Sequence, residues 1–367
     1  MSDVLSSRRV RVWLPVAVIL TILFAFGARY DALPSAPTGW SKAGSSGTLP
    51  PSGGGVSLAT EPNVDWSRFA YTQYVTDSHY LCNSVMLFER LQHVGSRADR
   101  VMMYPAPMLE NPDATDGGSS DDARLLIKAR DEYGAKLVPI TVQRRASADK
   151  TWAESYTKLL AFNQTQYDRV LSLDSDSVLL QNMDELFLLP PCPVAMPRAY
   201  WLYPETMILS SQVMLVTPSE VEFGHVMDKI NQAGRDDYDM EIVNYLYKDS
   251  ALVLPHRPYD LLTGEFTLDE DKHRWYLGSD TEEWDPVKVF NEAKFLHFSD
   301  WPVPKPWLGM SDSVRQSKQP KCHVKDGVES CAEREIWLGI YREFVERRKR
   351  VCGRVAGEPL RRRRFSS

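Results

Sequence analysis

The sequence predicts an α/β protein with a mainly parallel sheet. Short apolar segments alternate with segments of helical periodicity between residues 69 and 298, and this alternation is typical of parallel strands joined by helices. The chain has 367 residues, of which 43% are hydrophobic, so it can build one large domain or two small ones. We find neither an internal repeat nor a glycine-rich phosphate loop. In such sheets, ligands bind beyond the carboxyl ends of the strands.

The individual elements follow from apolar periodicity and from turn residues. A strand at 69–75 is followed by a helix at 84–91, a strand at 100–104 and a turn-rich stretch from 105 to 122. Further strands are expected at 136–140, 170–173, 194–196, 212–216, 251–254 and 294–298. Further helices are expected at 123–133, 154–163, 220–233 and 240–248.

The N-terminus has the features of a membrane anchor. Residues 12–28 carry no charge and would span ~25 Å as a helix, which is short but sufficient for a thin bilayer. Arginines cluster before this segment, whereas only Arg29 follows it closely, so the N-terminus is expected to be cytoplasmic. A cleaved signal peptide is the alternative, because small residues such as Ala25 lie near a plausible cleavage site.

These features divide the chain into five parts. We expect a cytoplasmic tail (1–11), a transmembrane signal-anchor (12–28), a flexible stem rich in Pro, Gly and Ser (29–66), a globular body (67–312) and a basic C-terminal extension (313–367). The protein would then be a single-pass type II protein of the Golgi or endoplasmic reticulum membrane with a lumenal body. Asn163-Gln164-Thr165 is the single glycosylation sequon, and its position at the end of a predicted helix suggests that it is buried.

Charge and cysteine content exclude other classes of protein. The net charge is −6, so nothing indicates a nucleic-acid partner. Basic residues outnumber acidic ones from Arg342 onward, which indicates a solvated, partly disordered tail or contact with an anionic membrane or an acidic partner. Five scattered cysteines indicate neither a disulfide scaffold nor a structural zinc site. Cys322 and Cys331 could pair if the body is lumenal.

Two carboxylates follow the predicted strand at 170–173. The apolar segment ends in Asp174-Ser175-Asp176, which places both carboxylates where ligands bind in a parallel sheet. Adjacent ionised carboxylates need a cation beside them. Hard divalent ions such as Mn²⁺ and Mg²⁺ bind carboxylate oxygens together with substrate phosphate oxygens. An Asp-x-Asp pair alone is often a solvated turn, but its position after a buried strand favours a metal site.

A second polar group occurs far downstream. His297 follows the apolar residues Phe295 and Leu296, and Lys305 comes eight residues after it. Neutral imidazole is a common metal ligand, and a lysine can neutralise a phosphate as a point charge. A lone histidine is more often a core residue with a satisfied hydrogen bond. The Asp-x-Asp pair makes the metal-ligand interpretation of His297 the stronger one.

These motifs together resemble glycosyltransferase family 8, the glycogenin-like family of retaining transferases. The resemblance extends from about residue 69 to 307. Its closest part is Leu-His-Phe-Ser-Asp-Trp-Pro at 296–302 with Lys-Pro-Trp at 305–307, which is most similar to fungal α-N-acetylglucosaminyltransferases of that family. The resemblance implies a GT-A fold, a Rossmann-like mixed, mainly parallel sheet flanked by helices that binds a nucleotide-diphospho-sugar. It also implies a UDP-sugar donor and Mn²⁺ or Mg²⁺.

The resemblance assigns roles residue by residue. The metal ligands would be Asp174, Asp176 and His297, with Lys305 on the diphosphate and acting in catalysis. Tyr80 would stack on the uracil base. The remaining donor-binding residues would be Tyr74, Thr76, Asp77, Lys158 and Ser175.

The sequence departs from the family pattern at three places. The family's Asn-Ser-Gly turn is Ser-Ser-Gln at 210–212, and its later Asp-Gln segment is Asp239-Met240, so a polar glutamine is replaced by methionine. Asp239 is the candidate catalytic contact to sugar or acceptor, with Asp236 and Glu241 behind it. The third departure is the segment from His297 to Lys305.

This segment is two residues longer than in glycogenin, and the additional length contains Trp301 and Pro302. The acceptor side is therefore expected to differ from that of glycogenin, and self-glucosylation is not expected.

The sequence thus predicts a retaining, metal-dependent glycosyltransferase of the secretory pathway. GlcNAc is the sugar favoured by the resemblance, and a glycan or glycoconjugate is the expected acceptor. Three alternatives stay open: a glucosyl- or galactosyltransferase of the same family, a catalytically degenerate protein that binds a nucleotide sugar, and a metal-dependent phosphodiesterase or nucleotide hydrolase. The last is disfavoured because the chain lacks further His/Asp clusters for a two-metal site.

Overall fold

A computed structural model of the chain describes residues 64–144, 154–203, 205–325, 327–354 and 357. The expected cytoplasmic tail and signal-anchor, and nearly all of the expected stem, lie outside the described residues. Within the described ranges, no helix combines the length and the apolar character needed to cross a bilayer.

A seven-stranded sheet forms the centre of the body, in the order β3-β2-β1-β4-β7-β6-β8. The strands β1 (Phe69–Tyr74), β2 (Asp99–Pro105), β3 (Ala135–Ile140) and β4 (Arg169–Leu173) are mutually parallel. β7 (Val213–Val216) is antiparallel to β4 and to β6 (Val194–Pro197), and β6 pairs in parallel with β8 (Leu252–Leu254). The expected mixed, mainly parallel α/β architecture is confirmed.

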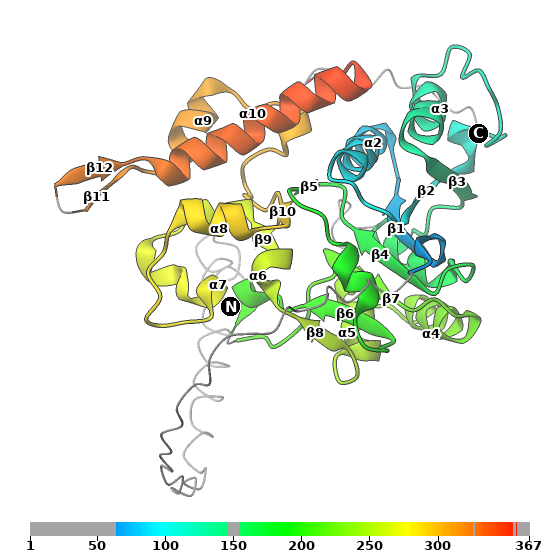
Figure 1. The fold of residues 1–367 in the computed structure, drawn as a ribbon, viewed down its shortest axis with the longest axis horizontal. Helices are drawn as coiled ribbons and strands as arrows, with labels where there is room; N and C mark the ends of the chain where they lie inside the picture. The colour runs from blue at the N-terminus through cyan, green and yellow to red at the C-terminus, as the bar shows by residue number, and fades with distance from the viewer. Residues whose placement is uncertain (1–63, 145–153, 204, 326, 355–356, 358–367) are drawn as a thin grey trace, which may run out of the picture. The chain divides into compact units, whose positions relative to one another are not determined.

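Helices cover both faces of this sheet. Successive side chains of a strand point to opposite faces, so neighbouring apolar residues of one strand pack against different helices. On β1, Ala70 and Tyr71 belong to different hydrophobic clusters. The cluster of Tyr71 includes residues of α2 (Ser78–His93), α3 (Asp121–Tyr133) and α10 (Ala332–Cys352). The cluster of Ala70 includes residues of α4 (Glu220–Asn231) and α5 (Asp239–Tyr247). Accordingly, α2 and α3 lie on one side of the sheet and α4 and α5 on the other (Figure 1).

Local signals set the ends of the helices that the sequence predicts well. The Ser120 side chain accepts a hydrogen bond from Ala123 N at the start of α3. Two aspartates in the first turn stabilise the helix further, because their negative charge lies at the positive end of the helix dipole. Gly134 ends the helix with φ 66°, a left-handed conformation that suits a residue without Cβ. The following strand β3 therefore begins at the next residue, Ala135.

A smaller three-stranded sheet was not expected. It has the order β5-β10-β9, with β5 (Ser177–Leu179), β10 (Phe295–His297) and β9 (Leu261–Leu262). β10 is antiparallel to β5, and the register places His297 opposite Ser177. Because β5 follows the Asp-Ser-Asp segment directly, this pairing brings the downstream histidine to the end of β4.

The remaining elements lie mainly in the C-terminal half. They are the helices α6 (His256–Tyr259), α7 (Arg274–Leu277), α8 (Pro286–Glu292) and α9 (Asp312–Lys318), the hairpin of β11 (His323–Lys325) and β12 (Val328–Ser330), and eight 3₁₀ helices: η1 (Trp66–Arg68), η2 (Ala106–Met108), η3 (Ser155–Asn163), η4 (Asp184–Leu188), η5 (Tyr200–Leu202), η6 (Thr263–Thr267), η7 (Glu270–Lys272) and η8 (Pro306–Leu308).

The helix expected at 154–163 is present as the 3₁₀ helix η3, in which the side chains from Tyr156 to Phe162 are all buried. One expectation for this segment is wrong. Asn163 itself is exposed rather than buried, since it lies at the end of this element.

The chain from Arg342 to Cys352 is also not a solvated tail. It belongs to α10, a 21-residue helix in which Trp337 and Phe344 are buried. The apolar residues of this helix recur on one face and pack against α2 and α8. Among the basic residues that suggested a tail, Arg342, Lys349 and Arg350 are exposed on this helix, whereas Arg347 and Arg348 are buried.

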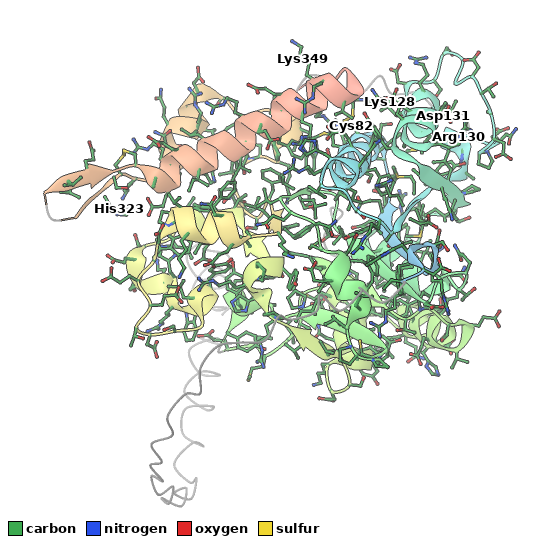
Figure 2. All side chains as sticks on the ribbon, viewed as in Figure 1. Cys82, Lys128, Arg130, Asp131, His323 and Lys349 are labelled. Carbon is green, nitrogen blue, oxygen red and sulfur yellow. A yellow bond between two sulfur atoms is a disulfide. The ribbon has the colours of Figure 1, made fainter. Side chains whose placement is uncertain are left out.

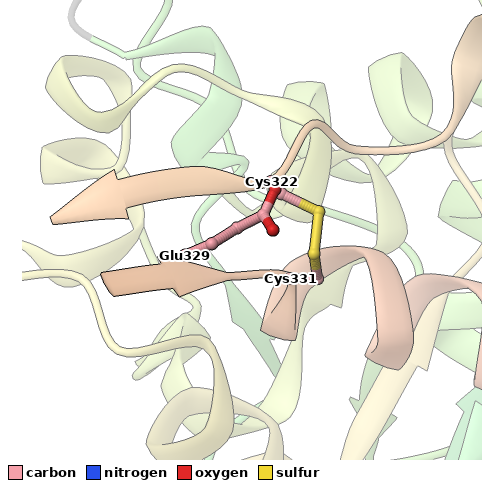
Figure 3. Close-up of side chains that lie close together, drawn as sticks. All are labelled: Cys322, Glu329 and Cys331. Carbon is pink, nitrogen blue, oxygen red and sulfur yellow. A yellow bond between two sulfur atoms is a disulfide. The ribbon is translucent and has the colours of Figure 1, made fainter. Parts of the chain in front are cut away.

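Two disulfides close the C-terminal region. Cys322 pairs with Cys331 at the base of the β11–β12 hairpin, as the sequence allowed, and the Glu329 carboxylate lies beside this disulfide (Figure 3). Because both sulfurs are bonded to each other, they are not thiolate ligands for a metal at this cluster. Cys82 of α2 pairs with Cys352 at the end of α10, 270 residues away, and Cys82 lies on the part of α2 near α10 (Figure 2).

We predict that the Cys82–Cys352 disulfide stabilises the whole body. A cross-link over a separation of 270 residues restricts the unfolded chain strongly, so Cys352→Ser is expected to lower the free energy of unfolding by about 2–5 kcal/mol. Thermal unfolding under non-reducing conditions measures this. Cys192→Ser is the matched control, because Cys192 is a free, half-buried cysteine. An equal effect of both substitutions would contradict the prediction.

Candidate active site

The site is built on the end of β4. Leu173 is the last residue of the strand, and Asp174-Ser175-Asp176 leads directly into β5. Backbone hydrogen bonds hold this short segment on both sides: Asp174 N donates to Gln212 O over 3.0 Å, and Phe298 N donates to Asp176 O over 3.0 Å. The carboxylates are therefore placed by the main chain of two sheets and not by a mobile loop.

The three expected metal ligands lie together. One ligand atom from each of Asp174, Asp176 and His297 falls within 4.8 Å of the others. His297 Nε2 lies 3.1 Å from Asp176 Oδ1, and the side chains of Asp174 and His297 are largely buried. Two carboxylates and an imidazole are a donor set that suits Mn²⁺. The residues present therefore fit a divalent cation.

Lys158 lies beneath this group. It reaches from η3, and its Nζ lies 2.7 Å from Asp174 Oδ1 and 2.7 Å from Asp239 Oδ2. It also donates to Ser211 O over 3.2 Å. Burial alone would lower the pKa of Lys158, but the carboxylates of Asp174 and Asp239 outweigh it and raise this pKa. Lys158 is therefore a permanent cation at the floor of the site.

Asp239 is the carboxylate on the far side of Lys158. It opens α5, and it accepts a hydrogen bond from the Ser211 hydroxyl over 2.7 Å. Burial raises the pKa of Asp239, but Lys158 has the larger combined effect and lowers the pKa below its ordinary value. Asp239 is therefore held ionised and in a fixed orientation.

Lys305 supplies a second cation on the other side. Its Nζ lies 2.8 Å from Asp176 Oδ2 and also donates to Phe298 O. Burial would raise the pKa of Asp176, but His297 and Lys305 lower it well below the ordinary value. Unlike Lys158, Lys305 is partly exposed, with 34% of its side chain accessible. Its ammonium can therefore meet a charged group that arrives from solvent.

The residues expected to hold the nucleotide lie along the end of β1 and the start of α2. The Tyr74 hydroxyl donates to Asp174 Oδ1 over 3.3 Å, so it contacts one of the candidate metal ligands. Asp77 caps α2 by accepting from His79 N and Tyr80 N. The ring of Tyr80 packs edge-on against Trp307, with the centroids 5.5 Å apart. Thr76 is half-buried between Tyr74 and this cap.

The structure does not place every candidate in the site. Asp236 is exposed in the turn between α4 and α5, and no described contact joins it to the cluster of Asp174, Asp176 and His297. Glu241 accepts from Tyr238 N and so completes a capping box at the start of α5. Its carboxylate therefore has a local structural partner.

Two neighbours of the site were missed from the sequence as functional residues. Ser211 contacts both Lys158 and Asp239, although it lies in the turn that departs from the family pattern. Asp260, just before β9, is fully buried, and burial raises its pKa to about 7. The nearby Ser210 hydroxyl lowers this pKa but does not complete a hydrogen bond in good geometry. No local sequence pattern marks either residue.

Comparison with known proteins finds close relatives among fungal proteins. The chain is 60% identical over 295 residues to glucose N-acetyltransferase 1 of Gibberella zeae, which covers 80% of this chain and 64% of the relative. The chain thus spans less than two thirds of that relative's length. It is 43% identical over 365 residues to glucose N-acetyltransferase 1 of Aspergillus fumigatus, which covers 95% of this chain and 88% of the relative. No protein-family model matches the chain.

More distant similarities were also found. The chain is 26% identical over 184 residues to inositol phosphorylceramide glucuronosyltransferase 1 of Arabidopsis thaliana, covering 50% of this chain and 31% of that protein. Among solved structures, the glycosyltransferase GlyE of Streptococcus pneumoniae has a TM-score of 0.48 at 16% identity, covering 79% of this chain and 65% of that chain. The galactosyltransferase LgtC has a TM-score of 0.43 at 11% identity, covering 80% and 97%.

We predict that Asp260 makes the stability of the body depend on pH. Its pKa is 3.8 when exposed and about 7 in the folded protein, so its contribution to stability is fully present below pH 3.8 and is lost as the pH rises from 3.8 through 7. Over this window the loss is on the order of 1.4 kcal/mol per pH unit. Asp260→Asn cannot ionise, so its stability relative to wild type is expected to increase from pH 5 to pH 8.

Urea unfolding at both pH values in the presence of a chelator measures this difference. Asp249→Asn is the control, because Asp249 is exposed in the turn after α5. A difference between Asp260→Asn and wild type that is the same at both pH values would show that the prediction is wrong.

Proposed function

This chain belongs to the glucose N-acetyltransferase 1 family within glycosyltransferase family 8, and from this premise we propose that it transfers N-acetylglucosamine from UDP-GlcNAc to a glycan acceptor. It is a glycosyltransferase with the GT-A arrangement of that family, a mixed, mainly parallel sheet with the Asp-x-Asp segment after a central strand. Metal dependence, retention of configuration and the identity of the sugar are parts of the proposal.

One observation carries this proposal: Asp174, Asp176 and His297 converge beside the partly exposed Lys305. The carboxylates and the imidazole would hold the divalent cation, most simply Mn²⁺. Such a cation would supply positive charge that stabilises the diphosphate of the donor as a leaving group. Lys305 now neutralises Asp176, and it can exchange this partner for the diphosphate when the donor binds.

Asp239 and Lys158 have a different task in this scheme. Lys158 holds the ionised Asp239 carboxylate in place, and Asp239 is the proposed contact to the transferred sugar or to the acceptor hydroxyl. The bond from the anomeric carbon to the phosphate oxygen breaks, and UDP leaves with the electron pair. The acceptor oxygen attacks from the same face, and its proton passes to the departing phosphate. No side chain has to be a covalent nucleophile, although Asp239 can be tested as one.

A second candidate function rests on the departures from the family pattern. Met240 has no polar group, and Ser210, Ser211 and Gln212 replace the family's turn, so the protein could bind a nucleotide sugar without transferring it. The buried cation–carboxylate group argues against this, because a site freed from catalysis has little need for a costly cluster of charges. The relatives' name, read literally, describes transfer of an acetyl group instead, and the assay below includes that reaction.

We predict metal-dependent release of UDP from one donor. The full-length protein is incubated with UDP-GlcNAc, UDP-glucose or UDP-galactose and a mixed glycan acceptor, with Mn²⁺ or with a chelator. Release is expected from UDP-GlcNAc, and chelation or Asp176→Ala should reduce the rate at least about 100-fold. Asp249→Ala is the matched control, since that carboxylate is exposed and outside the site. Acetyl-CoA with glucosamine is the parallel arm.

Turnover that survives both the chelator and Asp174→Asn would contradict the metal role. Release of CoA rather than UDP would favour acetyl transfer. Tight binding of UDP without release from any donor would favour the binding protein.

We also propose that the protein is a type II membrane protein whose body lies in the Golgi or endoplasmic reticulum lumen. The support is the uncharged segment 12–28, the two disulfides and the exposed sequon at Asn163. In intact fungal microsomes, a C-terminal tag should be protected from protease until detergent is added. Asn163→Gln should remove any glycosidase-sensitive increase in mass. Digestion of the tag without detergent would contradict this topology.

A further inference from the structure

Trp301 has no place in the function described so far. Its side chain is 91% exposed, although tryptophan is a large residue that is mostly buried in folded proteins. Single exposed apolar residues are common on protein surfaces and by themselves indicate nothing. The glycogenin pattern gives no role to Trp301 either, because Trp301 lies in the additional length between His297 and Lys305. Its position relative to the site distinguishes it from other surface residues.

The segment that carries Trp301 is held firmly on its N-terminal side. The buried carboxylate of Asp300 accepts hydrogen bonds from the Tyr341 hydroxyl over 2.7 Å and from Trp337 Nε1 over 3.2 Å, and both donors lie on α10. Ser299 N donates to Thr263 Oγ1 over 3.0 Å. The backbone immediately before Trp301 is therefore tied to two other elements.

The segment is held on its C-terminal side as well. Lys305 Nζ lies 2.8 Å from Asp176 Oδ2, and Val303 N donates to Asp300 O over 2.6 Å, which closes a tight turn around Trp301. A segment fixed on both sides of one exposed residue presents that residue at a defined point. The loop therefore presents the indole to solvent from a fixed backbone position.

That point is near the reacting groups. Trp301 is four residues after the metal ligand His297 and four residues before Lys305. A fully extended chain covers at most ~14 Å over four residues. The Trp301 backbone therefore lies within this distance of the backbones of His297 and Lys305, which is within reach of a substrate that is longer than one sugar.

The chemistry of an exposed indole suits the face of a sugar ring. A pyranose presents C–H groups on its faces and hydroxyl groups around its edge, so the face packs on an aromatic ring while the edge stays hydrated. Tyr80 and its neighbour Trp307 already supply aromatic groups on the side where the base is expected. The acceptor glycan is the one substrate of the proposed reaction for which no aromatic contact has been assigned.

We propose that Trp301 is a stacking platform for a sugar ring of the acceptor glycan, next to the residue that receives the transferred sugar. This inference rests on the proposed function for the identity of the substrate. It goes beyond that function by assigning a specific residue to acceptor recognition, and it makes the 299–305 loop the element that selects the acceptor.

The test compares Trp301→Ala and Trp301→Phe with wild type in the full-length protein. The probe is a pool of fluorescent oligosaccharides released from fungal glycoproteins. For Trp301→Ala, the KM for the acceptor is expected to rise about tenfold or more. The kcat at saturating acceptor, the KM for UDP-GlcNAc and the slow release of UDP without acceptor should stay within about threefold of wild type. Trp301→Phe should recover most of the affinity, because it retains a flat aromatic face.

Trp275→Ala is the matched control, because Trp275 is another exposed tryptophan, 38% accessible, on α7. An unchanged acceptor KM in Trp301→Ala would overturn the inference. A rise in the KM for UDP-GlcNAc instead would assign Trp301 to the donor and would likewise overturn the inference.

Direct binding separates this inference from the proposed function. Fluorescence anisotropy measures binding of the same oligosaccharides to wild type and Trp301→Ala in the presence of UDP and Mn²⁺, without turnover. If wild type binds them but releases no UDP from any donor, the proposed reaction fails, and weaker binding by Trp301→Ala still supports the platform. Equal binding by both proteins would overturn the platform alone.

Discussion

Three carboxylates that lie together at one end of the central sheet impose the main constraint on this protein. Asp174 and Asp239 are buried and the Asp176 side chain is 17% exposed, so their like charges repel with little screening by water. Lys158 lies between two of them, and Lys305 pairs with the third. Removing one partner from a buried ion pair costs about 3–5 kcal/mol. The elements that carry Lys158 and Lys305 must therefore hold both ammonium groups beside these carboxylates, because the carboxylates can stay ionised only with a cation nearby.

The C-terminal helix helps to keep them in place. α10 is linked to α2 by the Cys82–Cys352 disulfide, and the buried guanidinium of Arg348 donates to Asn83 Oδ1 over 2.6 Å. The same helix binds Asp300 through Tyr341. It thus contacts both segments that flank the candidate donor site, the start of α2 and the loop that ends at Lys305. Residues 342–352, whose basic composition resembles that of a solvated tail, thus belong to a helix that supports the candidate site.

Much of the central sheet could be predicted, because strands buried on both faces are short and apolar and are separated by clear helical and turn signals. Elements whose conformation depends on packing were predicted less well. The helix expected at 154–163 is a 3₁₀ helix, and its residues from Tyr156 to Phe162 are buried. The short strands β5 and β9 have little periodicity of their own, and their pairing with β10 defines them.

The sequence by itself determined the α/β class, the Asp-x-Asp pair after β4 and the identity of the candidate metal ligands, because each of these can be recognised from residues that are close together in the chain. Only the tertiary structure decided how these segments meet. Lys158 and Asp239 are 81 residues apart, and Cys82 and Cys352 are 270 apart. The burial of Asp260, and with it the raised pKa of its carboxyl, likewise depends on distant segments. Hydrophobic periodicity reports which face of an element is buried, but it carries no information about which distant residue will lie against it.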